Sequence, residues 1–166
     1  MLDGKAVSIR FARSDEMDAV ARLYWSVCHE TQAPLQPATV AAFRDERFFT
    51  RRVTDLPQAP LVAIAGGRIV GFGGWTGRQL GQLFVAAEGR ASGIGATLLA
   101  ASERAMAESG QRQANLLVLR GNDRARRFYE RHGWTVVSAT VSDAATFDGP
   151  VPVEALEMTK DLIGAL

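Results

Sequence analysis

The sequence contains a single cysteine, no long hydrophobic run and no excess of either charge. Cys28 is the only cysteine among 166 residues, which excludes an intrachain disulfide framework and suits a reducing compartment. We expect its side chain to be a small buried hydrophobe. The longest apolar runs, such as residues 61–65, are far shorter than the roughly 20 residues that span a bilayer. Because the N-terminal region has no signal-peptide pattern, we expect a soluble cytoplasmic protein without a membrane partner.

The charges are almost balanced, with 19 basic and 18 acidic residues and a formal net charge of +1. Such a chain has no global field that would attract nucleic acid, so an anion must be bound at a local site. We expect neither a nucleic-acid partner nor a metal site. Hydrophobic residues make up 47% and charged residues 22%, which argues against disorder and suits one domain spanning residues 1–166.

Hydrophobic periodicity predicts elements in the order β-α-α-β-β-β-α-β-α-β-β. The predicted strands cover residues 7–11, 61–65, 69–75, 80–85, 116–119, 134–141 and 153–159. The predicted helices cover residues 14–29, 39–48, 93–109 and 122–132. Gly66 and Gly67 favour a tight hairpin turn, because glycine readily adopts positive φ. A strand, a long helix and a strand in succession predict a parallel pair, so the fold class is a single α/β domain with a mixed sheet.

Residues 85–95 combine a strand end with a helix N-terminus. The first amides of a helix lack intrahelical partners and carry partial positive charge, so such an end attracts phosphate. Gly93 and Gly95 let an anion approach the backbone closely, and Arg90 adds a side-chain charge. The segment alone is equally compatible with a tight turn and a solvated arginine. It matches neither the P-loop nor the dinucleotide fingerprint, which weakens ATP and NAD as ligands.

A second motif, Asn-Asp-Arg-Ala-Arg-Arg-Phe-Tyr-Glu-Arg-His-Gly-Trp, occupies residues 122–134. Together with residues 90–95, it resembles the GNAT N-acetyltransferase superfamily, whose motifs read [QR]-x-x-G-x-[GA] and N-x-x-A-x-x-[FL]-Y-x-x-x-G-[FW]. Both patterns match, in order. The resemblance implies a mostly antiparallel central sheet in which the two parallel strands, joined by a helix, splay apart. It also implies acetyl-CoA, or a related acyl-CoA, as co-substrate.

The resemblance assigns the two motifs to the co-substrate. It implies that the diphosphate lies on the amides of residues 90–95 and that the pantetheine arm inserts beside Phe84 and Val85. Asn122 is expected to cap a helix and to lie beside the pantetheine, while the small Ala125 leaves room for it. The implied binding residues are Phe84, Val85, Arg90, Ala91, Ser92, Gly93, Ile94, Gly95, Ala96, Asn122 and Ala125.

Tyr129 is the candidate catalytic residue, because the resemblance implies that it protonates the departing thiolate. A phenol with a reference pKa of about 10 stays protonated at neutral pH and can donate to sulfur. Packing of the ring on the sheet is the alternative explanation. A main-chain N–H near Val85 is expected to stabilise the oxyanion. The general base stays open, since Gln79 and Gln82 stand where some relatives supply a carboxylate, and a water relay is favoured.

Several assignments remain alternatives. His29 and Glu30 are expected to form a surface pair. One or two of five arginines meet the 3′-phosphate of CoA or belong to a solvated basic face: Arg120, Arg124, Arg126, Arg127 and Arg131. The acceptor is predicted to be a small-molecule or peptide amine, and two copies are expected to pair through their last strands. The rival functions are a non-catalytic acyl-CoA-binding or regulatory domain and an NAD(P)-dependent oxidoreductase.

Overall fold

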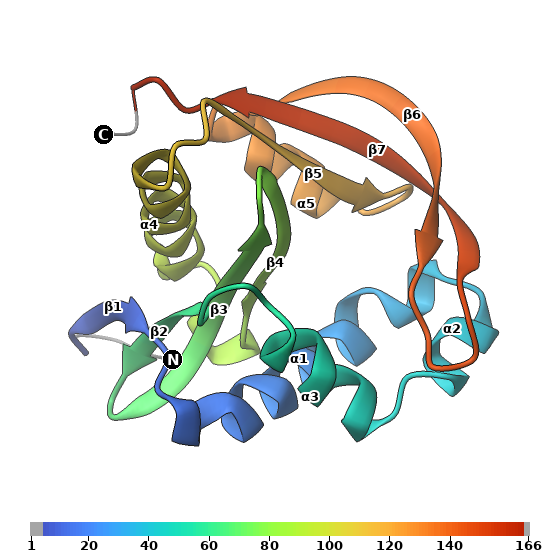
Figure 1. The fold of residues 1–166 in the computed structure, drawn as a ribbon, viewed down its shortest axis with the longest axis horizontal. Coiled ribbons are helices and arrows are strands. Elements are labelled where there is room, and N and C mark those ends of the chain that lie inside the picture. The colour runs from blue at the N-terminus through green and yellow to red at the C-terminus, as the bar shows by residue number, and fades with distance from the viewer. Residues whose placement is uncertain (1–4, 165–166) are drawn as a thin grey trace.

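The protein folds around one seven-stranded sheet with helices on both faces (Figure 1). This computed structural model describes residues 5–164. The strands are β1 (Val7–Phe11), β2 (Leu61–Ala65), β3 (Arg68–Thr76), β4 (Gln79–Val85), β5 (Gln113–Leu119), β6 (Thr135–Ala144) and β7 (Val151–Asp161). They are hydrogen-bonded in the order β1-β2-β3-β4-β5-β7-β6. In the described chain only β4 and β5 pair in parallel, which confirms the predicted mixed sheet.

The helices are α1 (Met17–Thr31), α2 (Ala38–Ala42), α3 (Glu46–Thr54), α4 (Ile94–Glu108) and α5 (Asp123–Arg131). Short 3-10 turns lie at Ser14–Glu16, Ala33–Leu35 and Ala87–Gly89. Helices α4 and α5 each begin and end within one residue of the prediction, and α1 continues beyond its predicted end at His29. Within residues 5–164, none of the helices has the length and apolar character that crossing a membrane requires.

The prediction of one helix from Thr39 through Phe48 is wrong. The chain breaks there into α2 and α3, because Asp45 is extended and its side chain accepts a hydrogen bond from the Phe48 N–H at 2.9 Å. That bond is a helix N-cap. Because of the break, α2 and α3 join two different hydrophobic clusters. Val40 of α2 packs beside β6 and β7, whereas Phe49 of α3 packs on Tyr24 of α1.

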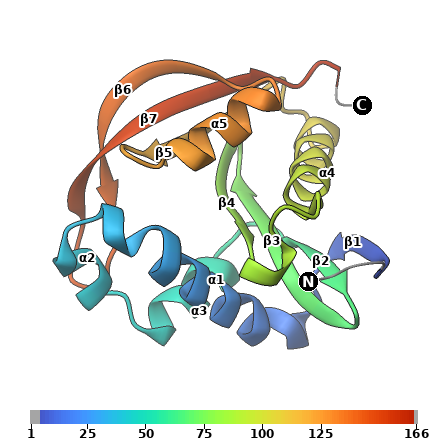
Figure 2. The same ribbon diagram turned by 180° about the vertical axis from the view of Figure 1, so that it is seen from behind.

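Two hydrophobic clusters cover opposite faces of the sheet. On one face, α4 and α5 cover strands that include β5 and β7 (Figure 2). Leu98, Met106 and Met158 are fully buried in this layer. On the other face, α1 and α3 pack against β2, β3 and β4, where Tyr24 contacts Phe72 and Phe84 through their rings. These two layers hold β4 firmly in place in the centre of the sheet.

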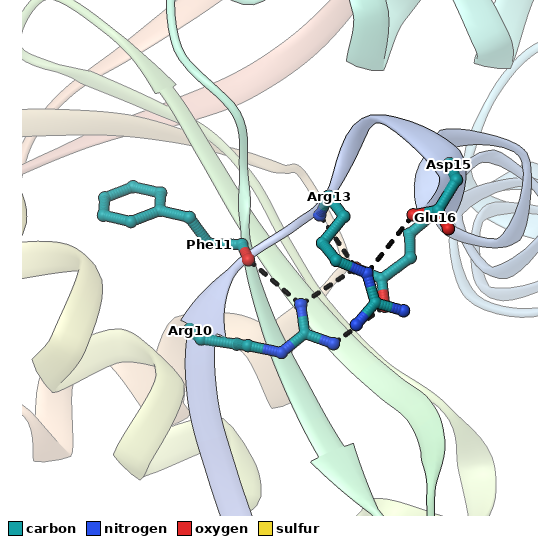
Figure 3. A network of polar contacts seen from close by, with 5 residues as sticks. All are labelled: Arg10, Phe11, Arg13, Asp15 and Glu16. Atoms are coloured by element: carbon teal, nitrogen blue, oxygen red, sulfur yellow. Dashed lines mark hydrogen bonds and ion pairs between the residues drawn. The ribbon is translucent and has the colours of Figure 1, made fainter.

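Helix α1 is anchored at its start by the Glu16 carboxylate, which binds two arginines (Figure 3). Arg10 donates two hydrogen bonds to the two carboxylate oxygens, at 2.9 and 2.7 Å. The backbone N–H of Arg13 donates a third, at 2.8 Å. These contacts, with the Arg10 hydrogen bonds contributing most, lower the pKa of Glu16 to about 2. The carboxylate therefore stays ionised at neutral pH and joins β1 to the first turn of the helical layer.

Strands β4 and β5 touch at one end and then diverge. Gln79 and Asn115 form their single recorded register pair, and the Asn115 N–H donates to the Arg78 carbonyl at 2.9 Å. Beyond this junction the two ribbons run apart (Figure 1). The geometry therefore agrees with the splayed parallel pair that the resemblance implies. A gap in the ladder leaves backbone groups of both strands available to a ligand.

Cys28 is buried, as predicted, with 5% of its surface exposed. Burial raises the pKa of its thiol to about 12, so the sulfur stays protonated at neutral pH. A thiol in this state is neither a nucleophile nor a metal ligand. Its side chain packs in the hydrophobic cluster that joins α1 and α3 to strands β2, β3 and β4.

Candidate functional site

A cleft of about 710 Å³ lies where β4 and β5 part. Its size falls in the range of about 300–1,000 Å³ that is usual for small-molecule sites. It is lined by predicted residues from both motifs: Phe84, Val85, Arg90, Ala91, Gly93, Gly95, Ala96, Asn122, Ala125 and Tyr129. Of the remaining predicted residues, Ile94 turns its side chain into the core with Ala63 and Val70. Ser92 does not line the cleft, and its hydroxyl donates to the Gly89 carbonyl.

The loop between β4 and α4 presents a run of unpaired backbone N–H groups. Among the described residues, the six amides of residues 91–96 donate to no protein acceptor. The run is bounded by Arg90, whose N–H donates to the Ala87 carbonyl at 3.2 Å, and by Thr97, whose N–H donates to the Gly93 carbonyl at 3.0 Å. The free amides thus begin at Ala91, one residue later than we expected. Six consecutive donors at a helix start suit a multiply charged anion.

The loop owes its shape to two residues with left-handed backbone. Gly93 has φ of +81° and serves as the N-cap of α4. Ala91 has φ of +62°, and it is the only non-glycine residue with positive φ in the described chain. An L-residue with a β-carbon is strained in this region, by roughly 1–2 kcal/mol. The strain is consistent with a loop whose conformation serves ligand binding rather than stability.

Arg90 is not a free charge at the mouth of the loop. Its guanidinium donates to both carboxylate oxygens of Glu30, at 2.8 and 3.1 Å, and its Nε donates to the Val85 carbonyl at 3.2 Å. We had expected Glu30 to pair with His29, but Glu30 pairs with Arg90 of the loop. His29 instead stacks on Trp25, with ring centroids 5.4 Å apart. The guanidinium lowers the pKa of Glu30.

The backbone of β4 points donors into the cleft. The Ala86 N–H donates to the Val70 carbonyl of β3 at 2.8 Å, and Val85 lies opposite Gly71. Hydrogen-bonding groups alternate in direction along an antiparallel strand, so the N–H groups of Val85 and Leu83 face away from β3. The Val85 carbonyl, which Arg90 reaches, confirms this direction. These groups face the gap towards β5, where a ligand can pair with them as an added strand would.

Helix α5 brings the second motif to the opposite wall. Asn122 caps it as predicted, since its side-chain oxygen accepts a hydrogen bond from the Ala125 N–H at 3.2 Å. Ala125 and Tyr129, one helical turn apart, both line the cleft. The ring of Tyr129 packs edge-on against Phe128 and Trp134, at centroid distances of 5.2 and 5.8 Å. This packing holds the ring in a fixed orientation.

The Tyr129 hydroxyl has no hydrogen-bond partner among the described residues. Burial raises the pKa of this phenol above its ordinary value, because an apolar site disfavours the charged form. The group is therefore a neutral donor at physiological pH. It is able to donate to an anion that develops in the cleft.

A buried polar network behind Tyr129 was not predicted from the sequence. Glu103 of α4 accepts hydrogen bonds from the Trp134 indole and the Lys160 ammonium, each at 2.9 Å. Lys160 also donates to the His132 carbonyl at 2.7 Å. The network joins α4, β7 and the end of α5, and it holds the Trp134 ring against Tyr129. The sequence did hold a signal for this network, because Glu103 is an acidic residue on the buried apolar stripe of α4, between Leu99 and Met106.

Other lining residues were also missed. Helix α1 contributes Val27 and Thr31 to the cleft, and Gln32, directly after the helix, also lines it. His132, directly after α5, also lines the cleft. Its Nδ1 lies 2.7 Å from the Phe128 carbonyl and is the donor, because a carbonyl oxygen can only accept. These side chains carry no sequence signal of their own, because only the folded chain brings α1 and the end of α5 to the same opening.

The five arginines around the second motif separate into two groups. Arg124 and Arg131 line the cleft. Arg120 pairs with Glu154 at 2.9 Å, and Arg126 lies near the acidic residues of its own helix. Arg127 is exposed. Of the five arginines considered for the 3′-phosphate of CoA, Arg124 and Arg131 therefore stay as candidates.

Comparison with known proteins now identifies the family. A family described as "Acetyltransferase (GNAT) domain" matches residues 28–147. Comparison with curated protein sequences gives no match. Because the matched segment covers more than half of the chain, the chain belongs to the GNAT acetyltransferase family. It is therefore an acyl-CoA-dependent acetyltransferase, and the resemblance seen in the sequence is confirmed.

Solved structures share the fold at low sequence identity. A GCN5-related N-acetyltransferase from Rhodopseudomonas palustris superposes with a TM-score of 0.75 at 19% identity, covering 93% of this chain and 94% of that one. PaiA N-acetyltransferase from Thermoplasma acidophilum, in complex with coenzyme A, gives 0.71 at 20% identity, covering 94% and 99%. YncA from Salmonella typhimurium, with acetyl-CoA, gives 0.70 at 19% identity, covering 95% and 94%. At these identities the likeness shows the fold alone.

Proposed function

We propose that this protein transfers an acetyl group from acetyl-CoA to a primary amine, by direct attack of the neutral amine on the thioester. The observation that carries the proposal is the run of six unpaired amides, residues 91–96, at the end of a cleft between two splayed strands. A diphosphate fits the amides, and an extended arm fits the gap beside β4. A thioester on that arm would then lie deep between the strands.

The pantetheine arm would pair with the exposed backbone of β4. Val85 and Leu83 turn N–H groups towards the gap, and one of them would donate to the thioester oxygen as it becomes negative. Asn122 and Ala125 line the wall along which the arm passes. Arg124 and Arg131 are placed to meet the 3′-phosphate. The two complexes noted above, with coenzyme A and with acetyl-CoA, support this choice of co-substrate.

Tyr129 would act as the general acid. Attack by the amine breaks the C–S bond and leaves a thiolate, which needs a proton or a strong hydrogen bond. A neutral phenol that lines the cleft and has no protein partner among the described residues can supply it. General acid–base catalysis of this kind contributes typically about 100-fold or more.

The acceptor would be a small-molecule or peptide amine. Thr31 at the end of α1 and Gln32 directly after it line the cleft, so these polar side chains would contact the acceptor. The edge strand β6 exposes Val137 and Val141, with 54% and 67% of their surfaces accessible. Two copies would pair along this edge, and sedimentation analysis would detect the dimer.

Binding and turnover test the proposal directly. Calorimetry should show coenzyme A binding to the wild-type protein, and thiol release should accompany turnover of acetyl-CoA with some member of a panel of amines, polyamines, amino acids and peptides. Tyr129→Phe should reduce kcat about 100-fold while coenzyme A still binds. Tyr24→Phe is the matched control, because Tyr24 is buried in the other hydrophobic cluster, and it should leave kcat unchanged.

Four results would count against the proposal or a part of it. Failure of coenzyme A to bind would remove its basis, and preferential binding of NAD(P) would support an oxidoreductase instead. Tight binding with no turnover of any amine would indicate a non-catalytic binding domain. Full kcat in Tyr129→Phe, with the chemical step shown to limit the rate, would refute the general-acid role alone.

A further inference from the structure

The position of the acyl group follows from the direction of the strands. The unpaired amides of residues 91–96 lie beyond the carboxyl end of β4, whereas β4 and β5 meet near its amino end, at Gln79 and Asn115. An arm that runs from the amides into the gap therefore ends near this junction. The acyl group at the tip of the arm would lie close to Asn115 and the residues that follow it on β5.

The amine must approach this junction from one particular face. Along β5, Leu116 and Val118 point into the layer of α4 and α5, with 2% and 4% of their surfaces exposed. Leu117 between them points to the opposite face and is 40% exposed, although it lines the cleft. On the α5 side of the junction, Leu116 and Val118 border the cleft but are packed against other side chains, which leaves little room there for an acceptor. The face that carries Leu117 is open to an acceptor.

Glu157 of β7 stands on this open face beside Leu117. The two residues are register partners in the β5 and β7 ladder, so their side chains share a face and their β-carbons lie about 4.5–5.5 Å apart. Glutamate is uncommon in the middle of a central strand, where β-branched and aromatic residues are favoured. A half-buried carboxylate at this position therefore calls for a polar partner.

The neighbours of Glu157 orient its carboxylate but do not saturate it. Asn115 donates through its side-chain amide at 3.4 Å, and the Ser138 hydroxyl donates at 3.3 Å, one to each carboxylate oxygen. Both contacts are long for hydrogen bonds, and a carboxylate accepts about four. Capacity for stronger donors remains on both oxygens.

Asn115 adds a second unused acceptor at the same place. Its side-chain oxygen is buried and has no hydrogen-bond partner within residues 5–164. Native proteins rarely leave such an atom unsatisfied, and an exception calls for a bound water, ion or ligand. The Glu157 carboxylate and the Asn115 oxygen together match the donors of an ammonium group, which has three N–H donors and no acceptor.

We infer that Glu157 binds the ammonium group of the acceptor, with Asn115 as the second contact, and removes the proton that blocks attack. The inference deepens the proposed function and rests on it. Among the described residues, the cleft lining itself contains no Asp or Glu, so the carboxylate nearest the junction along β5 comes from β7. Glu30 is not a competitor, because both of its oxygens bind Arg90.

Protons and electron pairs balance in this scheme. The ammonium gives one proton to Glu157 and becomes a neutral amine, whose lone pair forms the C–N bond. The C–S bond breaks, and the thiolate takes a proton from the Tyr129 hydroxyl. The attacking nitrogen loses a second proton, which restores Tyr129 through water. Glu157 releases its proton to solvent, so each turnover yields an amide, a free thiol and one proton.

Glu157→Gln tests the inference, because it removes the charge and keeps the shape. We expect kcat/KM for the amine to fall about 100-fold or more, while coenzyme A affinity and the melting temperature stay near the wild-type values. Glu157→Asp keeps the carboxylate and should recover part of the loss. Glu154→Gln is the matched control, because Glu154 lies on the same strand, on the opposite face, paired with Arg120. It should retain wild-type kcat/KM.

The outcomes separate this inference from the proposed function. Wild-type turnover together with a Glu157→Gln variant within about twofold of wild type would overturn the role of Glu157 alone. The same holds if His132→Gln, which alters the other side of the junction, causes the large loss in place of Glu157→Gln. Failure of the wild-type protein to acetylate any amine would overturn the inference and the proposed function together.

Discussion

Glu30 and Arg90, 60 residues apart in the chain, are joined by two hydrogen bonds at 2.8 and 3.1 Å. The pair ties the end of α1 to the start of the loop that presents free amides. Arg90 is the more buried partner, with 17% of its side chain exposed against 51% for Glu30. The carboxylate therefore holds the guanidinium in place but also opposes its positive charge.

Removal of the Glu30 charge should strengthen coenzyme A binding. Glu30→Gln leaves Arg90 in contact with the Val85 carbonyl, but the negative charge near the free amides is lost. We expect a several-fold lower dissociation constant at low ionic strength, and a smaller change at high salt because exposed charges are screened. Calorimetric titrations at two salt concentrations measure this. Weaker binding would show that the ion pair is needed mainly to position the loop.

Ala91→Gly should stabilise the protein. Ala91 has φ of +62°, which glycine adopts without strain. The relief of roughly 1–2 kcal/mol is partly offset by the greater freedom of glycine in the unfolded chain, which leaves a gain of up to about 1 kcal/mol. Urea denaturation measures the difference. The same substitution at the exposed Ala100, inside α4, should cost about 1 kcal/mol, and equal effects at both sites would contradict the strain argument.

Glu16 should make the stability depend on pH in the acidic range. Its folded pKa is about 2, against an ordinary value of 4.5, because Arg10 and Arg13 bind the ionised form. The stabilisation is present above pH 4.5 and is lost as the pH falls towards 2. Glu16→Gln should therefore be less stable than wild type at pH 7, and the two should converge at low pH. Parallel denaturation curves with a constant difference from pH 7 to pH 2 would refute this.

Glu103→Ala should destabilise the fold and reduce activity. The substitution removes the acceptor of the Trp134 indole and the partner of Lys160. Loss of one member of a fully buried ion pair costs about 3–5 kcal/mol, and since Lys160 is partly exposed we expect about 2 kcal/mol. Because Trp134 supports Tyr129, kcat should also fall. Glu108→Ala, at the exposed end of α4, serves as control and should change stability by less than about 0.5 kcal/mol.

Local patterns in the sequence were sufficient for most elements. Helix α4 has its apolar stripe, and α5 has an Asn122 cap at the start and Gly133, with φ of +85°, after its end. These signals act within a few residues and do not depend on the rest of the fold. The failure at α2 and α3 has the same origin, since Asp45 is a capping residue that was not weighed against the apolar spacing.

The two motifs of the site were predicted, but apart from the Asn122 cap its hydrogen bonds and ion pairs were not. That residues 90–95 and 122–134 serve one ligand followed from the resemblance, because nothing in either segment alone specifies the distance between them. The partner of Arg90 could not be predicted, as Glu30 belongs to another helix. The same applies to Glu157, which reaches the open face of the junction only through the register of β5 and β7.

The sequence by itself determined most of the elements, the glycine-containing loop and the identity of the family, because these depend on residue order and short spacing. Only the tertiary structure decided which charges meet, which amides stay unpaired and where β4 and β5 separate. The physical reason is that hydrogen bonds and ion pairs act over a few ångströms. Residues far apart in the chain come within that range only after the hydrophobic layers have packed.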